Sequence, residues 1–283
     1  MLKSFCIKTN DIHILDYIAT NLEKLDFYDL SLSRNSFKIY RNIILHYSGK
    51  NPDKFYSSIS TILTNVIKSF YELSFINRIL NTNYFYFDLS EKNRIIDICL
   101  NTLEDENCLF NAVYNSFYEY IEKNKSMVLD GFANFRLKEY AYMIDSTVEF
   151  SVNKFLVDQE YEEFIKLLKS YIKSKNNAVD IVHLIYASET CILLDKYKNI
   201  ISLNKNILNA KYLSDISFSS NDYTLNTLLN ILPAVLNIHI IDKEDDFIRT
   251  LKLIFDDRVF ICTDCSLCKT YRLTSNVVHA EKE

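Results

Sequence analysis

Three cysteines near the C-terminal end of the chain carry the clearest chemical signal. Cys262, Cys265 and Cys268 follow the apolar run 259–261, which is typical of a buried strand, so we expect the thiols at the exit of that strand. Their spacing matches the first three ligands of an iron–sulfur CxxCxxC run, and it also matches an incomplete zinc site that lacks one ligand. A CxxC redox pair is a third alternative, although its usual helix N-terminus is not evident from the sequence. Unliganded structural thiols are the fourth.

A strand–helix–strand pattern around these cysteines predicts where a fourth ligand lies. Residues 235–241 and 259–262 have the composition of strands, and 244–255 has helical spacing with acidic residues in its first turn. A connection of this length predicts a right-handed βαβ unit with parallel strands. Parallel strands end at the same edge of a sheet, so we expect His239 to lie near Cys262.

His239 is therefore the candidate fourth ligand. His279, which is local in sequence, is the next candidate, followed by Cys6 and Cys191. The alternative is that His239 is an ordinary strand histidine without a metal.

Most common catalytic signatures are absent. The chain has two glycines, Gly49 and Gly131, which stand too far apart for a Walker A loop, a GxGxxG fingerprint or a GxSxG elbow. An HExxH zinc motif is also missing from the sequence. These absences favour a protein that is not an enzyme.

Charge and hydropathy indicate a cytoplasmic protein. The formal net charge of −5 argues against nucleic acid as a general partner. The seven cysteines, a start without a cleavable signal peptide and the lack of a long uncharged apolar stretch favour the reducing cytosol, without membrane insertion.

Hydrophobic periodicity divides the chain into three segments of a mixed α+β protein. Residues 1–50 predict a β-α-β-β unit with Asp11 as a helix N-cap, and 51–177 predict a helical region with a break at Asp158 and a linker at 173–177. Residues 178–283 predict an α/β domain with a hairpin at 181–194, a helix ended by Pro233 and the βαβ unit.

Arg136 and Lys138 form a candidate surface for a protein partner or nucleic acid. Aromatic side chains surround both residues, which is a common composition for contact surfaces. The alternative is a solvated helix start that pairs locally with Glu139 or Asp145.

Three stretches give the chain a family resemblance: GFANFRLKEY at 131–140, DQEYEEFIKLL at 158–168 and FDDRVFICTDCSLC at 255–268. From about Gly131 to Cys268 the chain resembles the YtxC-like family of sporulation proteins of endospore-forming bacteria. The resemblance implies a cytoplasmic protein associated with spore formation, and it supplies no catalytic residue.

Two classes of function follow. The leading hypothesis is a sporulation-associated binding or regulatory module that acts on protein partners. The alternative is a metal- or iron–sulfur-dependent enzyme or redox protein that uses Cys262, Cys265 and Cys268. A weaker alternative is nucleic-acid binding through the region of Arg136.

Overall fold

The structure is a computed structural model, which describes residues 3–25, 29–37, 40–104, 107–175, 179–187, 190–201 and 219–280. The chain divides into two compact units, Met1–Asp158 and Gln159–Glu283. Each unit has its own buried apolar cluster. The predicted division into segments 1–50, 51–177 and 178–283 stays a prediction.

The first unit contains a four-stranded sheet in the order β2-β3-β1-β4. Its strands are β1 (Lys3–Thr9), β2 (Leu30–Ser36), β3 (Arg41–Tyr47) and β4 (Ser126–Val128). The first three strands and the helix α1 (Ile12–Glu23), which is N-capped by Asp11, form the predicted β-α-β-β unit. Strand β4 lies inside the segment predicted as helical and pairs parallel with β1. Sequence periodicity missed it because three residues are too few to show an alternation.

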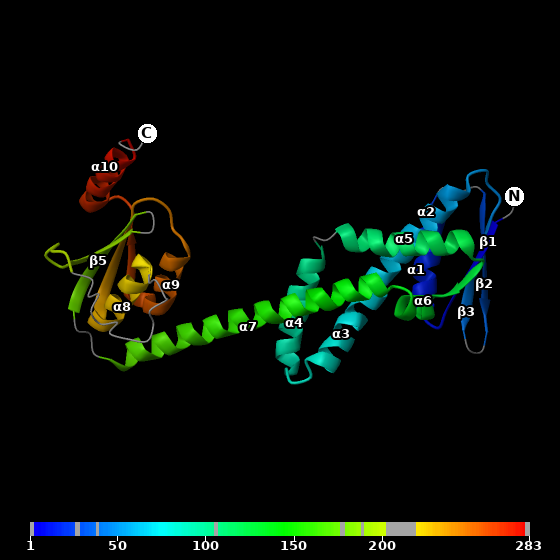
Figure 1. Cartoon of the computed structure of the whole chain (residues 1–283), viewed down its shortest axis with the longest axis horizontal. Helices are drawn as coiled ribbons and strands as arrows, with labels where there is room; N and C mark the ends of the chain where they lie inside the picture. Colours follow the sequence, from blue (N-terminus) through cyan, green and yellow to red (C-terminus); the bar gives the residue numbers. More distant parts are fainter. Residues whose placement is uncertain are drawn as a thin grey trace. The chain divides into compact units, whose positions relative to one another are not determined.

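Helices pack on one face of this sheet and on one another, as Figure 1 shows. They are α1, α2 (Pro52–Val66), α3 (Glu72–Asn83), α4 (Leu89–Glu104), α5 (Asn107–Lys123) and α6 (Leu129–Phe135), with a π-helical turn at Ile67–Tyr71 between α2 and α3. Alternate residues of β1, among them Phe5 and Ile7, are buried against these helices. A single core therefore joins the strands to the helical segment.

Helix α7 (Lys138–Ser174) runs without interruption for 37 residues. The predicted break at Asp158 is wrong, because an exposed aspartate leaves the backbone hydrogen bonds of a helix intact. Residues 173 and 174 of the predicted linker belong to this helix, and the rest of that linker lies partly outside the described residues.

The second unit contains a four-stranded sheet in the order β6-β5-β7-β8. Its strands are β5 (Val179–Ala187), β6 (Thr190–Asp195), β7 (Pro233–Ile240) and β8 (Val259–Cys262). Strands β5 and β6 form the predicted antiparallel hairpin, while β5, β7 and β8 run parallel. The mixed α+β class and the βαβ unit are confirmed.

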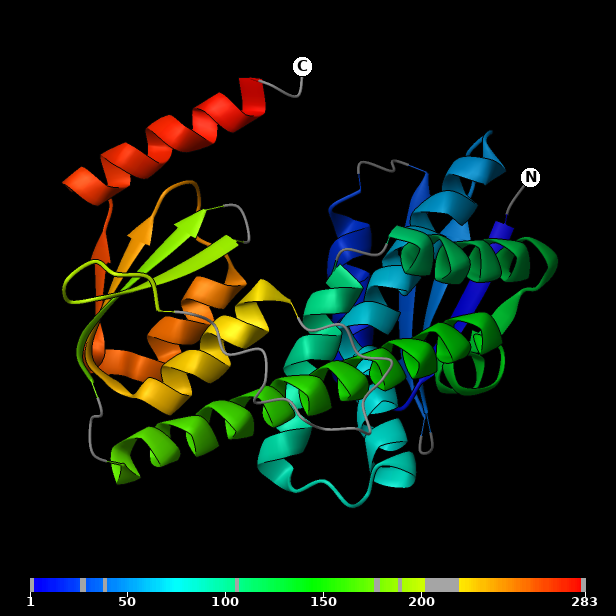
Figure 2. The same cartoon turned by 60° about the vertical axis from the view of Figure 1, so that its left-hand side comes forward.

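The two faces of this sheet have different covers. Helices α8 (Ser220–Ile231) and α9 (Asp246–Phe255) lie on one face, where Leu184 and Ile238 are buried. Helix α10 (Ser266–Ala280), which the sequence did not predict, follows β8 directly. Figure 2 shows α10 beyond the edge at which β5, β7 and β8 end. Ile185 and Cys268 are buried together on the side of the sheet away from α8 and α9.

None of the helices in the described ranges is long and apolar enough to cross a membrane.

Candidate metal centre

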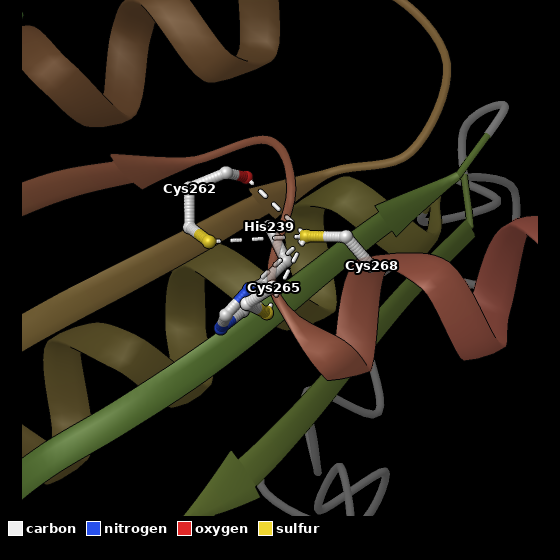
Figure 3. Close-up of side chains that lie close together, drawn as sticks. All are labelled: His239, Cys262, Cys265 and Cys268. Atoms are coloured by element: carbon white, nitrogen blue, oxygen red, sulfur yellow. Dashed lines mark hydrogen bonds between the residues drawn. The ribbon is translucent and has the colours of Figure 1, made fainter.

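Four side chains converge where β7 and β8 end and α10 begins. They are His239, Cys262, Cys265 and Cys268, and one ligand atom from each lies within 4.8 Å of all the others. Figure 3 shows the three sulfur atoms and the imidazole directed toward a common centre. His239 and Cys268 are buried, whereas Cys262 and Cys265 are half-buried. The structure thus brings together the candidate ligands that were selected from the sequence.

The pairing of β7 and β8 fixes the positions of two of the four side chains, His239 and Cys262. His239 and Cys262 are Cα partners on the parallel strands β7 and β8, so their side chains emerge side by side on one face. On the other side of His239 its Cα partner is Ile185 of β5, which is buried in the same apolar cluster as Cys268. The parallel pairing predicted from the βαβ unit is the direct cause of this proximity.

Helix α10 supplies the other two. The backbone N–H of Lys269 donates to the carbonyl of Cys265 at 3.0 Å, so Cys265 stands at the helix N-terminus and Cys268 lies one turn further on. Arg272 holds this helix to the sheet: its Nη2 donates to the Thr263 carbonyl at 2.6 Å and its Nε to the Ile241 carbonyl at 3.4 Å. The spacing of three residues places the thiols of Cys265 and Cys268 on one face of the helix, and the contacts of Arg272 hold that face against the strands.

Four of the six distances between the ligand atoms match the edges of a tetrahedron around one ion, and all six are within 4.8 Å. The sulfur of Cys268 lies 3.6 Å from that of Cys265 and 3.9 Å from that of Cys262. Nδ1 of His239 lies 3.4 Å from the Cys265 sulfur and 3.5 Å from the Cys268 sulfur. Bonds of about 2.3 Å to sulfur and about 2.0 Å to nitrogen, as zinc makes, give tetrahedral edges of about 3.8 Å between sulfurs and about 3.5 Å from sulfur to nitrogen. The group can therefore hold a metal ion.

The protonation states of these groups differ with their surroundings. Burial raises the pKa of the Cys268 thiol to about 11. Burial also opposes ionisation of Cys265, but hydrogen bonds from the Cys268 backbone and from the neighbouring thiols lower its pKa below the usual value. Burial, with the positive charges of His183 and Lys198, lowers the pKa of His239. A low pKa favours the neutral imidazole, which is the form that binds metals.

Sequence reasoning missed one residue that contacts the centre, His183 of β5. Its Nδ1 lies 3.0 Å from Nε2 of His239, and the two rings stack with centroids 5.2 Å apart. The strand itself was predicted, but its register with β7 was not. That register, in which His183 is partnered with Asn237, places it one row from His239 on the same face.

Of the remaining candidate ligands, Cys191 does not join the group. Cys191 lies on β6, where its side chain belongs to the cluster under α8 and α9 and its thiol donates to Asn221 Oδ1 at 3.3 Å. Cys6 belongs to the first unit. His279 lies in α10, and its side chain is outside the described part.

The candidate partner surface lies in the first unit. Arg136 stands between α6 and α7, and its guanidinium lies 5.2 Å from the centroid of the Tyr120 ring. It lines an open cavity of about 300 Å³ together with Lys123 and Glu119. Lys138 is exposed at the first residue of α7. Use of this surface by a partner stays a prediction.

Comparison with known proteins identifies the family. The YtxC-like family matches residues 57–260, which include His183 and His239 and end before Cys262. Over 128 residues the chain is 23% identical to the "Uncharacterized protein YtxC" of Bacillus subtilis (strain 168), a match that covers 45% of each chain. The chain thus spans about half the length of this curated relative. No solved structure gives a significant match. Because the family match extends over most of its length, the chain belongs to the YtxC-like family.

Proposed function

We propose that the second unit binds one zinc ion through Cys262, Cys265, Cys268 and Nδ1 of His239, and that this ion fastens α10 to the sheet. The observation that carries the proposal is that all four ligand atoms lie within 4.8 Å of one another, and that four of the six distances between them, 3.4–3.9 Å, have the length of tetrahedral edges around a single ion. A [4Fe–4S] cluster attaches each thiolate to a different iron and holds the sulfurs much further apart. The distances therefore favour zinc over such a cluster.

A structural role fits the ligand set better than a catalytic one. Four protein ligands close the coordination sphere, whereas catalytic zinc keeps one position for water or substrate. The ligands also come from two elements, the sheet edge and α10, which the ion would join. This reading agrees with a binding or regulatory module and gives no support to an enzyme.

Metal analysis tests the proposal. The full chain, purified anaerobically with any tag removed, should contain about one zinc per molecule and little iron. Replacement by cobalt(II) should give the visible absorption of a tetrahedral thiolate site. A colourless, metal-free protein with three freely alkylated thiols at Cys262, Cys265 and Cys268 would overturn it. Iron together with acid-labile sulfide would favour the iron–sulfur alternative instead.

A dithiol redox pair is the second candidate function. Cys265 and Cys268 form a CxxC at the N-terminus of α10, with their sulfurs 3.6 Å apart, and helix N-termini activate such thiols. A metal-free protein that forms a reversible Cys265–Cys268 disulfide in glutathione redox buffers would support this function over zinc binding.

The biological setting rests on the family alone. We propose that the protein is a cytoplasmic module that binds a protein partner during spore formation. Arg136 and Lys138 would form its contact surface. Deletion of the gene should lower spore yield or heat resistance, and reversal of both charges, Arg136→Glu with Lys138→Glu, should reproduce that defect. Normal sporulation of the deletion strain would remove this role and leave the zinc proposal intact.

A further inference from the structure

His183 and His239 form a direct imidazole–imidazole hydrogen bond next to the metal centre. Nδ1 of His183 lies 3.0 Å from Nε2 of His239, and the ring planes are inclined by 29°. The other nitrogen of His239, Nδ1, lies 3.4 Å and 3.5 Å from the sulfurs of Cys265 and Cys268. The buried ring of His239 therefore stands between the thiols and a second histidine.

The direction of this hydrogen bond follows from ligation. A ligand Nδ1 must carry no proton, so the proton of a neutral His239 stands on Nε2. The Nε2–H group then donates to Nδ1 of His183, which must also be unprotonated, and His183 carries its own proton on Nε2. The opposite direction would place the His239 proton on Nδ1 and prevent metal binding.

We propose that His183 is a positioning residue for the metal centre, which accepts the Nε2–H of His239 and thereby aims Nδ1 at the ion. Such partners fix the orientation of metal-bound histidines, and their loss usually lowers metal affinity 10- to 100-fold. The inference rests on the proposed zinc site for its effect on affinity, but the hydrogen bond itself can be tested without any metal.

Packing is the main alternative role for His183. Its ring stacks on His239, so its removal could loosen the site without any hydrogen bond. Asparagine separates the two roles, because its Oδ1 stands close to the position of the histidine Nδ1 and accepts a hydrogen bond, although the ring is lost. Leucine fills a similar volume and accepts none.

Zinc affinity of the full chain, measured by competition with a chromophoric chelator, gives the first readout. We expect His183→Leu to weaken zinc binding 10- to 100-fold. His183→Asn should stay within a few-fold of the wild type. Equal losses in both variants, with native-like spectra, would assign His183 to packing and overturn the inference. Unchanged zinc affinity in His183→Leu would also overturn the inference.

A nitrogen–nitrogen coupling across the hydrogen bond gives the second readout. In 15N-labelled protein we expect coupling between His239 Nε2 and His183 Nδ1 in both forms, and in the zinc-loaded form we expect the proton to be attached to His239. This measurement is made on both metal-free and zinc-loaded protein, so it remains decisive even if the chain binds no zinc and the proposed function fails. A proton on His183 Nδ1 in the zinc-loaded form, or no coupling in either form, would overturn the inference.

Discussion

His239 and Cys262 are register partners on adjacent parallel strands, whereas Cys265 and Cys268 come from a helix beyond the sheet. Backbone hydrogen bonds of β7 and β8 hold these two candidate ligands, His239 and Cys262, in place whether or not an ion is bound. The other two keep their positions only while α10 stays docked. Half of the site is therefore built into the sheet, and the ion should act mainly on the helix.

Metal removal should loosen α10 and leave the first unit unchanged. A ligand that binds only the folded state stabilises it by about 2.7 kcal/mol when its free concentration is 100 times Kd. On chelation, we expect amide hydrogens of β8 and α10 to exchange much faster, while those of α2 and α5 stay protected. Hydrogen-exchange mass spectrometry measures both regions in one experiment. Equal protection of α10 with and without the chelator would contradict a role for the ion in docking.

Loss of one thiol at the metal centre should lower zinc affinity far more than loss of a thiol elsewhere in the same unit. We expect Cys268→Ser to lower zinc affinity by more than about 100-fold, since a direct ligand contributes more than a supporting residue. Cys191→Ser is the matched control: Cys191 is also buried, but it lies on the opposite face of the sheet. Zinc content after dialysis and chelator competition provide the measurement. Similar losses in both variants would place the ion outside the proposed site.

The sequence predicted that the candidate ligands lie close together because a local pattern determined their geometry. The βαβ unit has a fixed handedness and parallel strands, so His239 and Cys262 had to reach the same edge. No comparable rule gives the register of β5 against β7, which depends on side-chain packing across strands distant in sequence. His183 therefore became visible only in the structure.

Helix α10 shows a second limit of sequence reading. The sequence predicts the cysteines at the exit of a strand and gives no evident helix N-terminus there. The helix is held to the sheet by Arg272, which donates to backbone carbonyls of Thr263 and Ile241. Such contacts cannot be read from periodicity. The short strand β4 was not predicted from the sequence for a related reason: its parallel partner β1 is more than a hundred residues away.

Arg272 should contribute measurably to the docking of α10. We expect Arg272→Leu to remove both carbonyl contacts, to destabilise the helix by about 1 kcal/mol and to speed its hydrogen exchange. Lys269→Leu is the control, because Lys269 makes an exposed pair with Asp264 at 3.8 Å, and such pairs contribute little. The two variants lose the same charge from neighbouring turns. Equal effects on exchange would show that charge, rather than the carbonyl contacts, holds the helix.

Glu72 should make the first unit less stable as the pH rises. Its side chain is 7% exposed and accepts a hydrogen bond from the Tyr140 hydroxyl at 2.8 Å, and burial raises the pKa of its carboxyl group. A raised folded-state pKa means that the fold favours the neutral acid, so stability is lost as the pH rises from the unfolded value, about 4.3, through the folded one. Glu72→Gln keeps an acceptor for Tyr140 without the charge. We therefore expect a higher free energy of unfolding at pH 7 for this variant, and a difference that shrinks toward pH 4. Denaturant unfolding between pH 4 and pH 7 measures this difference in the free energy of unfolding. The variant Glu139→Gln is the control, because Glu139 is exposed. A Glu72→Gln variant that is less stable than the wild type at pH 7 would contradict the prediction.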